Sequence, residues 1–178
     1  MEALLPLRRL PGWMKESATL REGSTVPDFE LPDDMNVAFK LSDRVRSRPL
    51  VIIFFPSVWG MMCAVEMSTF RDMISKFDEA GVQLCACDTN SVMSNAAWKE
   101  HMRIPFPVLS DFDGAVAARF GILCGDEGYL KGRSNRAIFI IDRTLNARYV
   151  WVADDPSYEP DYDEVLRVSS TVAAERQS

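Results

Sequence analysis

Residues 49–66 read PLVIIFFPSVWGMMCAVE, and this stretch decides the fold. Its first part, residues 49–55, is a continuous apolar run that ends before Pro56. A run this short, rich in β-branched and aromatic residues, predicts a strand buried on both faces rather than a core helix. After a short loop, Cys63 lies in the first turn of a predicted helix. A buried strand, a loop and a helix in this order are typical of α/β proteins.

Apolar side chains then repeat at steps of four and three residues: Cys63, Met67, Phe70, Ile74 and Phe77. This spacing predicts one long amphipathic helix, with Glu66 off the apolar stripe. Gly81 is a typical residue for the end of such a helix. The sequence VQLCACD at 82–88 follows it as a second buried strand. Strand, helix and strand together predict a right-handed βαβ unit with a parallel sheet.

Short elements continue on both sides of this unit. On the N-terminal side, residues 26–31 and 36–43 read as two short strands. On the C-terminal side we expect helices at 91–102 (capped by Ser91), 114–121 and 161–173, a strand at 105–111, and a hairpin of strands 136–142 and 147–153. A βαβ half followed by a ββα half describes a thioredoxin-like α/β fold with a central mixed sheet flanked by helices, an N-terminal extension and inserted elements.

The composition supports a single globular domain. The chain has 178 residues, of which 47% are hydrophobic and 26% are charged. Prolines and a glycine interrupt residues 1–21, so we expect an extension there and one domain over residues 22–178. The net charge of −6 argues against nucleic acid or an anionic membrane as a partner. Without a membrane-length apolar run or a secretory signal, a cytoplasmic protein is expected.

The cysteines and the histidine restrict the chemistry. Cys63, Cys85, Cys87 and Cys124 are too few and too unevenly spaced for a disulfide framework. Because His101 is the only histidine, the sequence excludes Ser-His-Asp triads and Cys-His proteases. No ligand spacing for zinc is present, and we expect neither a metal nor a cofactor. Cys85 and Cys87 lie inside a predicted buried strand and are expected to be unreactive.

Cys63 is the candidate reactive residue because it lies where a buried strand gives way to a helix. Unpaired N–H groups and the helix dipole favour a thiolate at such a position. Burial acts in the opposite direction, so a cationic neighbour is expected as well. The alternative is an inert core thiol. A thioredoxin-type Trp-Cys-x-x-Cys site is unlike this stretch, because Gly60 stands where its first cysteine would be.

The stretch Pro56-Ser-Val-Trp-Gly60-Met-Met-Cys63, with Glu66 three residues later, resembles the active-site motif of the peroxiredoxins. These are thiol peroxidases of the thioredoxin superfamily. Further matches to the family occur in order along the chain: GSTVPDFEL (23–31), FPVLSD (106–111), VAARFGI (116–122) and RAIFIID (136–142). The resemblance implies a thioredoxin-like fold and a peroxidase that reduces hydrogen peroxide or small organic hydroperoxides.

The resemblance also implies roles for individual residues. Cys63 would attack the peroxide as a thiolate and become a sulfenic acid. Arg136 would supply the cation, and Glu66 would hold its guanidinium. The alternatives for these two are an ordinary strand-end arginine and a solvated glutamate. Pro56 would shield the thiolate, and Gly60 replaces the Thr or Ser that contacts the peroxide in the family.

Two questions stay open at this point. Cys124, in the glycine-rich loop 123–135, is the candidate resolving cysteine, and the alternative is reduction by a thioredoxin-like protein or a small-molecule thiol. The absence of a hydroxyl at Gly60 leaves open a second function, that of an oxidant sensor or partner-binding protein with little turnover. The resemblance further implies a homodimer.

Overall fold

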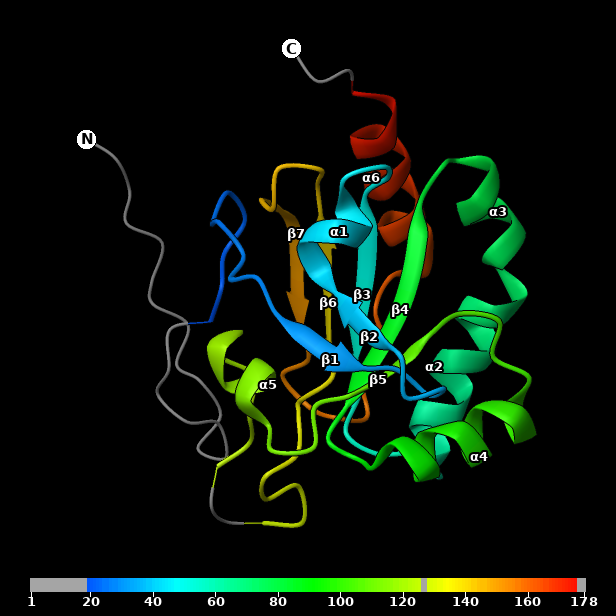
Figure 1. The fold of residues 1–178 in the computed structure, drawn as a ribbon, viewed down its shortest axis with the longest axis vertical. Coiled ribbons are helices and arrows are strands. Elements are labelled where there is room, and N and C mark those ends of the chain that lie inside the picture. The colour runs from blue at the N-terminus through cyan, green and yellow to red at the C-terminus, as the bar shows by residue number, and fades with distance from the viewer. Residues whose placement is uncertain (1–18, 126–127, 176–178) are drawn as a thin grey trace.

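The computed structural model describes residues 19–125 and 128–175. Its central sheet consists of β3 (Leu50–Phe54), β4 (Gln83–Asp88), β5 (Val108–Ser110), β6 (Ala137–Ile141) and β7 (Ala147–Val152). The strand order is β5-β4-β3-β6-β7 (Figure 1). β3, β4 and β5 are parallel, whereas β6 is antiparallel to both β3 and β7. The expected mixed sheet of an α/β protein is therefore confirmed.

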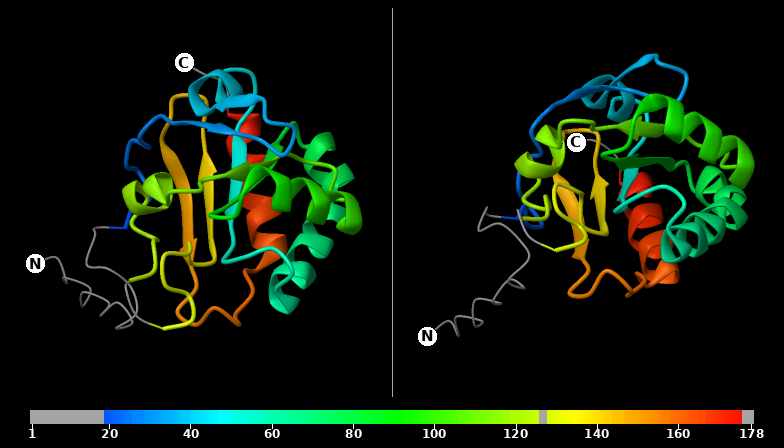
Figure 2. Two further views of the ribbon diagram at one scale, coloured as in Figure 1. Left: turned by 60° about the horizontal axis from the view of Figure 1, so that its bottom comes forward. Right: turned by 90° about the horizontal axis from the view of Figure 1, so that it is seen from below.

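Helices and a small hairpin cover the two faces of this sheet. The helices are α1 (Leu41–Val45), α2 (Met61–Asp72), α3 (Ile74–Glu79), α4 (Val92–Met102), α5 (Ala115–Arg119) and α6 (Tyr162–Ala174). The hairpin consists of β1 (Glu30–Pro32) and β2 (Ala38–Lys40), which pair in antiparallel fashion. Figures 1 and 2 show this hairpin and α6 on opposite sides of the sheet.

Two apolar cores form because side chains alternate between the faces of each strand. Ile52 and Phe54 of β3 belong to the core under the small hairpin, α1 and α5. Val51 and Ile53 belong to the core under α2, α3, α4 and α6. All five residues of β3 are buried, as the apolar run predicts. The loop that follows β3 therefore starts from a rigid position in the molecule.

The long helix expected after the buried strand is two helices, which corrects that prediction. α2 begins two residues before Cys63, so Cys63 does lie in the first turn. At Met73 the backbone has φ of −95° and ψ of −1°, and its N–H bonds to the carbonyls of both Thr69 and Phe70. This tightened turn separates α2 from α3 while the apolar stripe continues across it. Gly81, with φ of +74°, follows the end of α3 as expected.

The second N-terminal strand is shorter than expected, because residues 41–43 begin α1 instead. The side chain of Asp28 accepts a hydrogen bond from the Ser42 N–H at 2.9 Å. The Leu41 N–H bonds to the Phe29 carbonyl at 3.0 Å. Two donors that a helix start leaves unpaired are thus satisfied by the preceding segment, which favours a helix over a longer strand.

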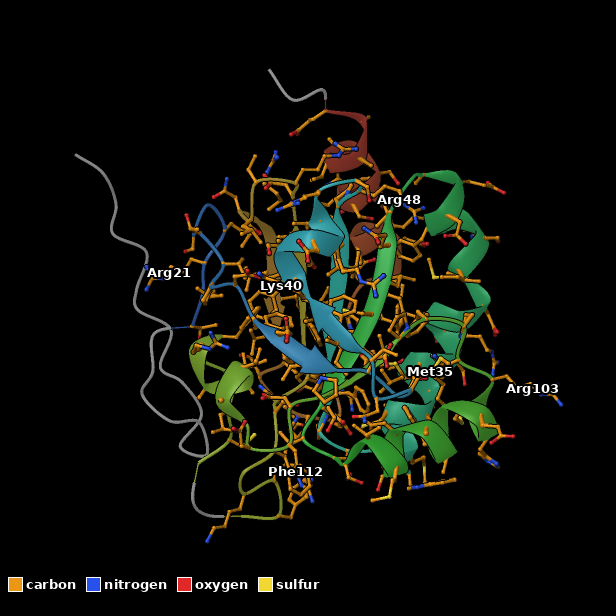
Figure 3. The ribbon with its side chains drawn as sticks, in the orientation of Figure 1. Arg21, Met35, Lys40, Arg48, Arg103 and Phe112 are labelled. Carbon is orange, nitrogen blue, oxygen red and sulfur yellow. The ribbon has the colours of Figure 1, made fainter. Side chains whose placement is uncertain are left out.

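Most other elements form where the sequence predicts them, with shorter ends. The Ser91 side chain accepts a hydrogen bond from the Ser94 N–H at 3.2 Å and caps α4, as expected. α4 ends at Met102 and is followed by Arg103, which has a left-handed backbone. Figure 3 shows the Arg103 side chain projecting away from the molecule. The strand predicted at 105–111 is limited to β5.

The predicted boundary between an extension at 1–21 and a domain at 22–178 stays a prediction, because residues 1–18 lie outside the described residues. Within the described part, Gly23 N–H already bonds to the Ala147 carbonyl at 2.7 Å. The chain is therefore attached to the central sheet from the start of the predicted domain. No helix among the described residues has the length and apolar character needed to cross a membrane.

Candidate active site

The sheet topology brings two distant segments together. Because β6 is antiparallel to β3, the residue before β6 lies beside the residues that follow β3. Phe54, the last residue of β3, pairs with Ala137, the first of β6. Arg136 therefore lies next to the loop between β3 and α2, although 73 positions separate it from Cys63.

Arg136 uses all three of its guanidinium nitrogens at this place. Its Nη2 donates to Cys63 Sγ at 3.5 Å, and its Nη1 donates to Glu66 Oε2. Its Nε donates to the Pro156 carbonyl at 3.1 Å. The side chains of Arg136 and Glu66 are buried, and Cys63 is 4% exposed. The structure thus joins three of the residues singled out in the sequence.

Glu66 binds Arg136 as the family resemblance implies, in a buried environment that its place off the apolar stripe does not predict. It lies three positions after Cys63, so both side chains share one side of α2 and face Arg136. Burial raises the pKa of Glu66 to about 7, against the lowering effect of Arg136. Its Oε1 has no hydrogen-bond partner among the described residues. The solvated-glutamate alternative is therefore wrong, and so is that of an ordinary strand-end arginine, since Arg136 is 1% exposed.

The pKa of the Cys63 thiol reflects opposing influences. Burial raises it above its ordinary value, and the charge of Glu66 acts in the same direction. The Arg136 guanidinium and the Ser57 N–H lower it. The cationic neighbour expected from the sequence is present, but burial outweighs it. Arg136 is thus the group that lowers the free energy of ionising this buried thiol.

Pro56 and Gly60 shape the loop that precedes Cys63. Pro56 is buried two residues after the end of β3. Gly60 is the N-cap residue of α2 and has an extended backbone that any residue can adopt. A Cβ atom at Gly60 would lie 3.2 Å from Cys63 Sγ and 3.3 Å from the Ser57 carbonyl oxygen. Gly60 is therefore the position from which a side chain would touch the sulfur.

Trp59 marks the outer side of the same loop. It is 60% exposed and has a left-handed backbone, with φ of +64°. Its ring lies 5.2 Å from that of His101 in α4, measured between centroids. His101 thus contacts the outer side of the active-site loop. It does not belong to the group formed by Cys63, Glu66 and Arg136.

The other cysteines are buried. Cys85 and Cys87 are 0% exposed, and burial raises the pKa of both thiols, in accord with the prediction that they are unreactive. Cys124 is 1% exposed, and burial raises its pKa to about 11. Its N–H bonds to the Arg133 carbonyl at 2.8 Å. All four cysteines, including Cys63, are free thiols.

Three polar residues beside the loop are missed by the sequence analysis: Asp88, Asn90 and Asn95. Asp88 and Asn95 are 0% exposed and hydrogen-bond to each other at 2.9 Å. Asn90 contacts the loop itself, at Ser57 and Val58. The available signal was Asp88, a carboxylate that closes an otherwise apolar buried strand. Among the described residues, no group of three or more His, Cys, Asp or Glu side chains is arranged to hold a metal ion.

Comparisons with known proteins agree with this geometry. Residues 23–150 match the AhpC/TSA family. A curated Mycobacterium tuberculosis protein named as a peroxiredoxin is 36% identical over 123 residues, which cover 69% of this chain and 79% of that protein. The crystal structure of peroxidoxin BcpB from Mycobacterium tuberculosis matches with a TM-score of 0.78 and 30% identity, covering 86% of this chain and 98% of that one.

A peroxiredoxin-like protein from Aquifex aeolicus matches with a TM-score of 0.80 and 25% identity, over 88% of this chain and 90% of that one. The family match spans the segments that carry Cys63, Glu66 and Arg136. The fold, the buried thiol beside a guanidinium and these matches lead to one conclusion: the chain belongs to the AhpC/TSA family and is a peroxiredoxin, a thiol-dependent peroxidase.

Proposed function

We propose that the protein reduces hydrogen peroxide or small organic hydroperoxides, with Cys63 as the attacking residue. The observation that carries this proposal is the contact between Cys63 Sγ and Arg136, whose guanidinium is also bound to Glu66. A guanidinium at this place favours the thiolate over the thiol. It also stabilises negative charge that develops on the peroxide oxygens during the reaction.

The first step is a two-electron transfer from sulfur to peroxide. The Cys63 thiolate attacks the terminal peroxide oxygen, so that an S–O bond forms while the O–O bond breaks. The leaving oxygen takes up a proton and departs as water from hydrogen peroxide, or as an alcohol from an organic hydroperoxide. Cys63 becomes a sulfenic acid. Pro56 limits the access of water to the sulfur, and Gly60 leaves space beside it.

An external thiol completes the cycle in our proposal. Its sulfur attacks the Cys63 sulfenic acid, which releases water and forms a mixed disulfide. A second thiol, from the same thioredoxin-like protein or from another small molecule, breaks this disulfide and restores Cys63. The burial of Cys124 and its pKa of about 11 support this route over resolution by Cys124, because the thiolate is the form that attacks.

The compartment and the assembly are part of the same proposal. Free cysteines at all four positions fit a reducing compartment, and we assign the protein to the cytoplasm. The exposed apolar side chains Trp59, Met61 and Val65, at and next to the start of α2, support a homodimer. The net charge of −6 supports partners other than nucleic acids and membranes. Sedimentation equilibrium measures the mass of the assembly, and a monomer at micromolar concentration contradicts the dimer.

Stopped-flow tryptophan fluorescence tests the proposed reaction, with exposed Trp59 as a reporter beside the site. We expect rapid oxidation of the wild-type protein by hydrogen peroxide or an alkyl hydroperoxide, and none in Cys63→Ser. Turnover with thioredoxin or a small thiol is followed by peroxide consumption. Oxidation no faster than that of a free thiol contradicts the proposal. A single fast oxidation without turnover would instead support the oxidant sensor, which the comparisons do not favour.

A further inference from the structure

A buried polar network lies under the active-site loop. Asp88, the last residue of β4, is 0% exposed. Its Oδ1 accepts hydrogen bonds from the Asn90 N–H at 3.2 Å and from Asn95 Nδ2 at 2.9 Å. Burying a carboxylate costs free energy, whereas burying an apolar side chain at the same place would not. We therefore expect the Asp88 carboxylate to have a role as a hydrogen-bond acceptor at this place.

Asn90 connects this carboxylate to the loop. Its Oδ1 accepts hydrogen bonds from the Val58 N–H and from Ser57 Oγ, each at 3.3 Å. Its own carbonyl accepts from Ser110 Oγ at 2.6 Å, which attaches it to the end of β5. The Asn90 backbone is thus held by Asp88 and Ser110, while its side chain holds the first residues after Pro56.

One of the loop residues held in this way, Ser57, acts on the sulfur through its backbone. The Ser57 N–H is one of the groups that lower the pKa of the Cys63 thiol. On the opposite side, Ser134 Oγ donates to the carbonyl of Phe55 at 2.8 Å, which fixes the end of β3. The direction of the Ser57 N–H is therefore set by two contacts. Ser134 holds the chain before Ser57, and Asn90 holds Ser57 and Val58.

We propose that Asp88 is a positioning residue for the peroxidatic sulfur, and that it acts through Asn90 on the loop that precedes Cys63. Asn95 keeps the carboxylate in place, because its Nδ2 also donates to the Leu109 carbonyl at 3.3 Å. The network acts by hydrogen-bond geometry and makes no contact with the peroxide. The importance of this role for catalysis rests on the proposed function of Cys63.

Asn90→Ala tests the link between the network and the loop. It removes the acceptor for the Val58 N–H and Ser57 Oγ but leaves the cores intact. We expect the second-order rate of Cys63 oxidation by hydrogen peroxide to fall about tenfold, the effect of one lost hydrogen bond near a charge. We expect the pKa of Cys63, measured by the pH dependence of iodoacetamide alkylation, to rise. Asn146→Ala is the matched control, since Asn146 bonds to Thr144 in the turn between β6 and β7.

Asp88 is tested by two variants that differ in one property. Asp88→Ala removes the acceptor and is expected to reproduce both effects of Asn90→Ala. Asp88→Asn keeps an acceptor oxygen without the charge and is expected to retain the wild-type rate within about twofold. Because both residues act along one path, the double variant Asp88→Ala/Asn90→Ala is expected to lose no more than either single variant. Thermal unfolding is recorded for each variant.

The outcomes separate positioning from general stability. Lower thermal stability of the Asn90→Ala and Asp88→Ala variants with an unchanged alkylation pKa overturns the proposal, because it shows a structural role only. Loss of rate in Asp88→Asn equal to that in Asp88→Ala also overturns it, since charge rather than geometry then matters. Alkylation does not depend on peroxide turnover. A wild-type protein that fails as a peroxidase but shows the predicted pKa shifts therefore refutes the proposed function and not the positioning role.

Discussion

Cys63 Sγ and Arg136 Nη2 lie 3.5 Å apart across 73 positions of sequence. The contact exists because β6 runs antiparallel beside β3, so that the start of one strand meets the end of the other. The same guanidinium binds Glu66, which is on the helix that carries Cys63. The ionisation of the thiol and the charge of the buried carboxylate are therefore coupled through one cation.

Replacing Arg136 by methionine removes the cation while keeping much of the volume. We expect the rate of Cys63 oxidation by peroxide to fall by about two orders of magnitude, since loss of a hydrogen-bonded charge costs roughly 1.5–3 kcal/mol. Glu66 then loses its buried partner, and the free energy of unfolding is expected to fall by about 3–5 kcal/mol. Stopped-flow fluorescence and urea unfolding measure the two effects.

The control for this prediction is the double variant Arg136→Met/Glu66→Met. An apolar pair in place of a buried ion pair is often neutral for stability, so unfolding is expected to return toward the wild-type value. The oxidation rate is expected to stay low, because the sulfur still lacks its cation. A double variant that regains both properties contradicts the catalytic role of Arg136.

Gly60→Ser adds a hydroxyl next to the sulfur, at the position where the peroxiredoxin active-site motif has Thr or Ser. We expect oxidation by hydrogen peroxide to become about 10- to 100-fold faster, the worth of one hydrogen bond to a charged group. Gly60→Ala is the control, because its Cβ alone crowds Sγ at 3.2 Å. If alanine accelerates the reaction as much as serine does, the hydroxyl is not the cause.

Glu66 is expected to make stability depend on pH. Burial raises its pKa from 4.5 to about 7, so the folded chain binds this proton more tightly than the unfolded chain. The resulting stabilisation is complete below about pH 4.5 and is lost as the pH rises through about 7. Glu66→Gln lacks this titration. The free energy of unfolding of the wild type minus that of the variant is therefore expected to fall between pH 5 and pH 8.

Urea unfolding at several pH values measures this difference. Glu30→Gln, which removes an exposed carboxylate, is the matched control. A difference between the wild type and Glu66→Gln that stays constant or grows with pH contradicts the raised pKa of Glu66.

Cys124→Ser distinguishes the two routes of reduction. With an external thiol as the reductant, the variant is expected to keep the wild-type turnover. Intact-mass spectrometry of the wild type after one equivalent of peroxide is expected to show one added oxygen. Loss of two hydrogens in the wild type but not in Cys124→Ser would show an internal disulfide instead and contradict the external route.

The sequence predicts the sheet and the place of Cys63 well, because both depend on local patterns. The apolar run before Pro56 is compatible only with a buried strand. Apolar residues at steps of three and four mark the helix that follows. Arg136 is different: its place beside the sulfur depends on the pairing of β6 with β3, and the family resemblance supplies it in advance.

The errors have physical causes that act across the chain. Glu66 looks solvent-exposed from periodicity alone, because a buried ion pair gives no sign of its distant partner. α1 depends on Asp28, which lies outside the helix and contacts Ser42 from the preceding segment. The interruption at Met73 does not change the spacing of the apolar residues, so the sequence pattern does not reveal it. Asp88 was visible only as a charge at the end of an apolar strand.

The third bond of Arg136, from Nε to the Pro156 carbonyl, has a consequence for the C-terminal part of the chain. Pro156 lies in the connection between β7 and α6. α6 packs on the same face of the sheet as α2. A truncation that removes this connection takes away the Nε bond, so that only Glu66 and Cys63 hold the guanidinium. The connection before α6 therefore supports the reaction centre from a distance, and deletion of residues 153–175 is expected to weaken the hold on Arg136 although none of them is near Cys63 in sequence.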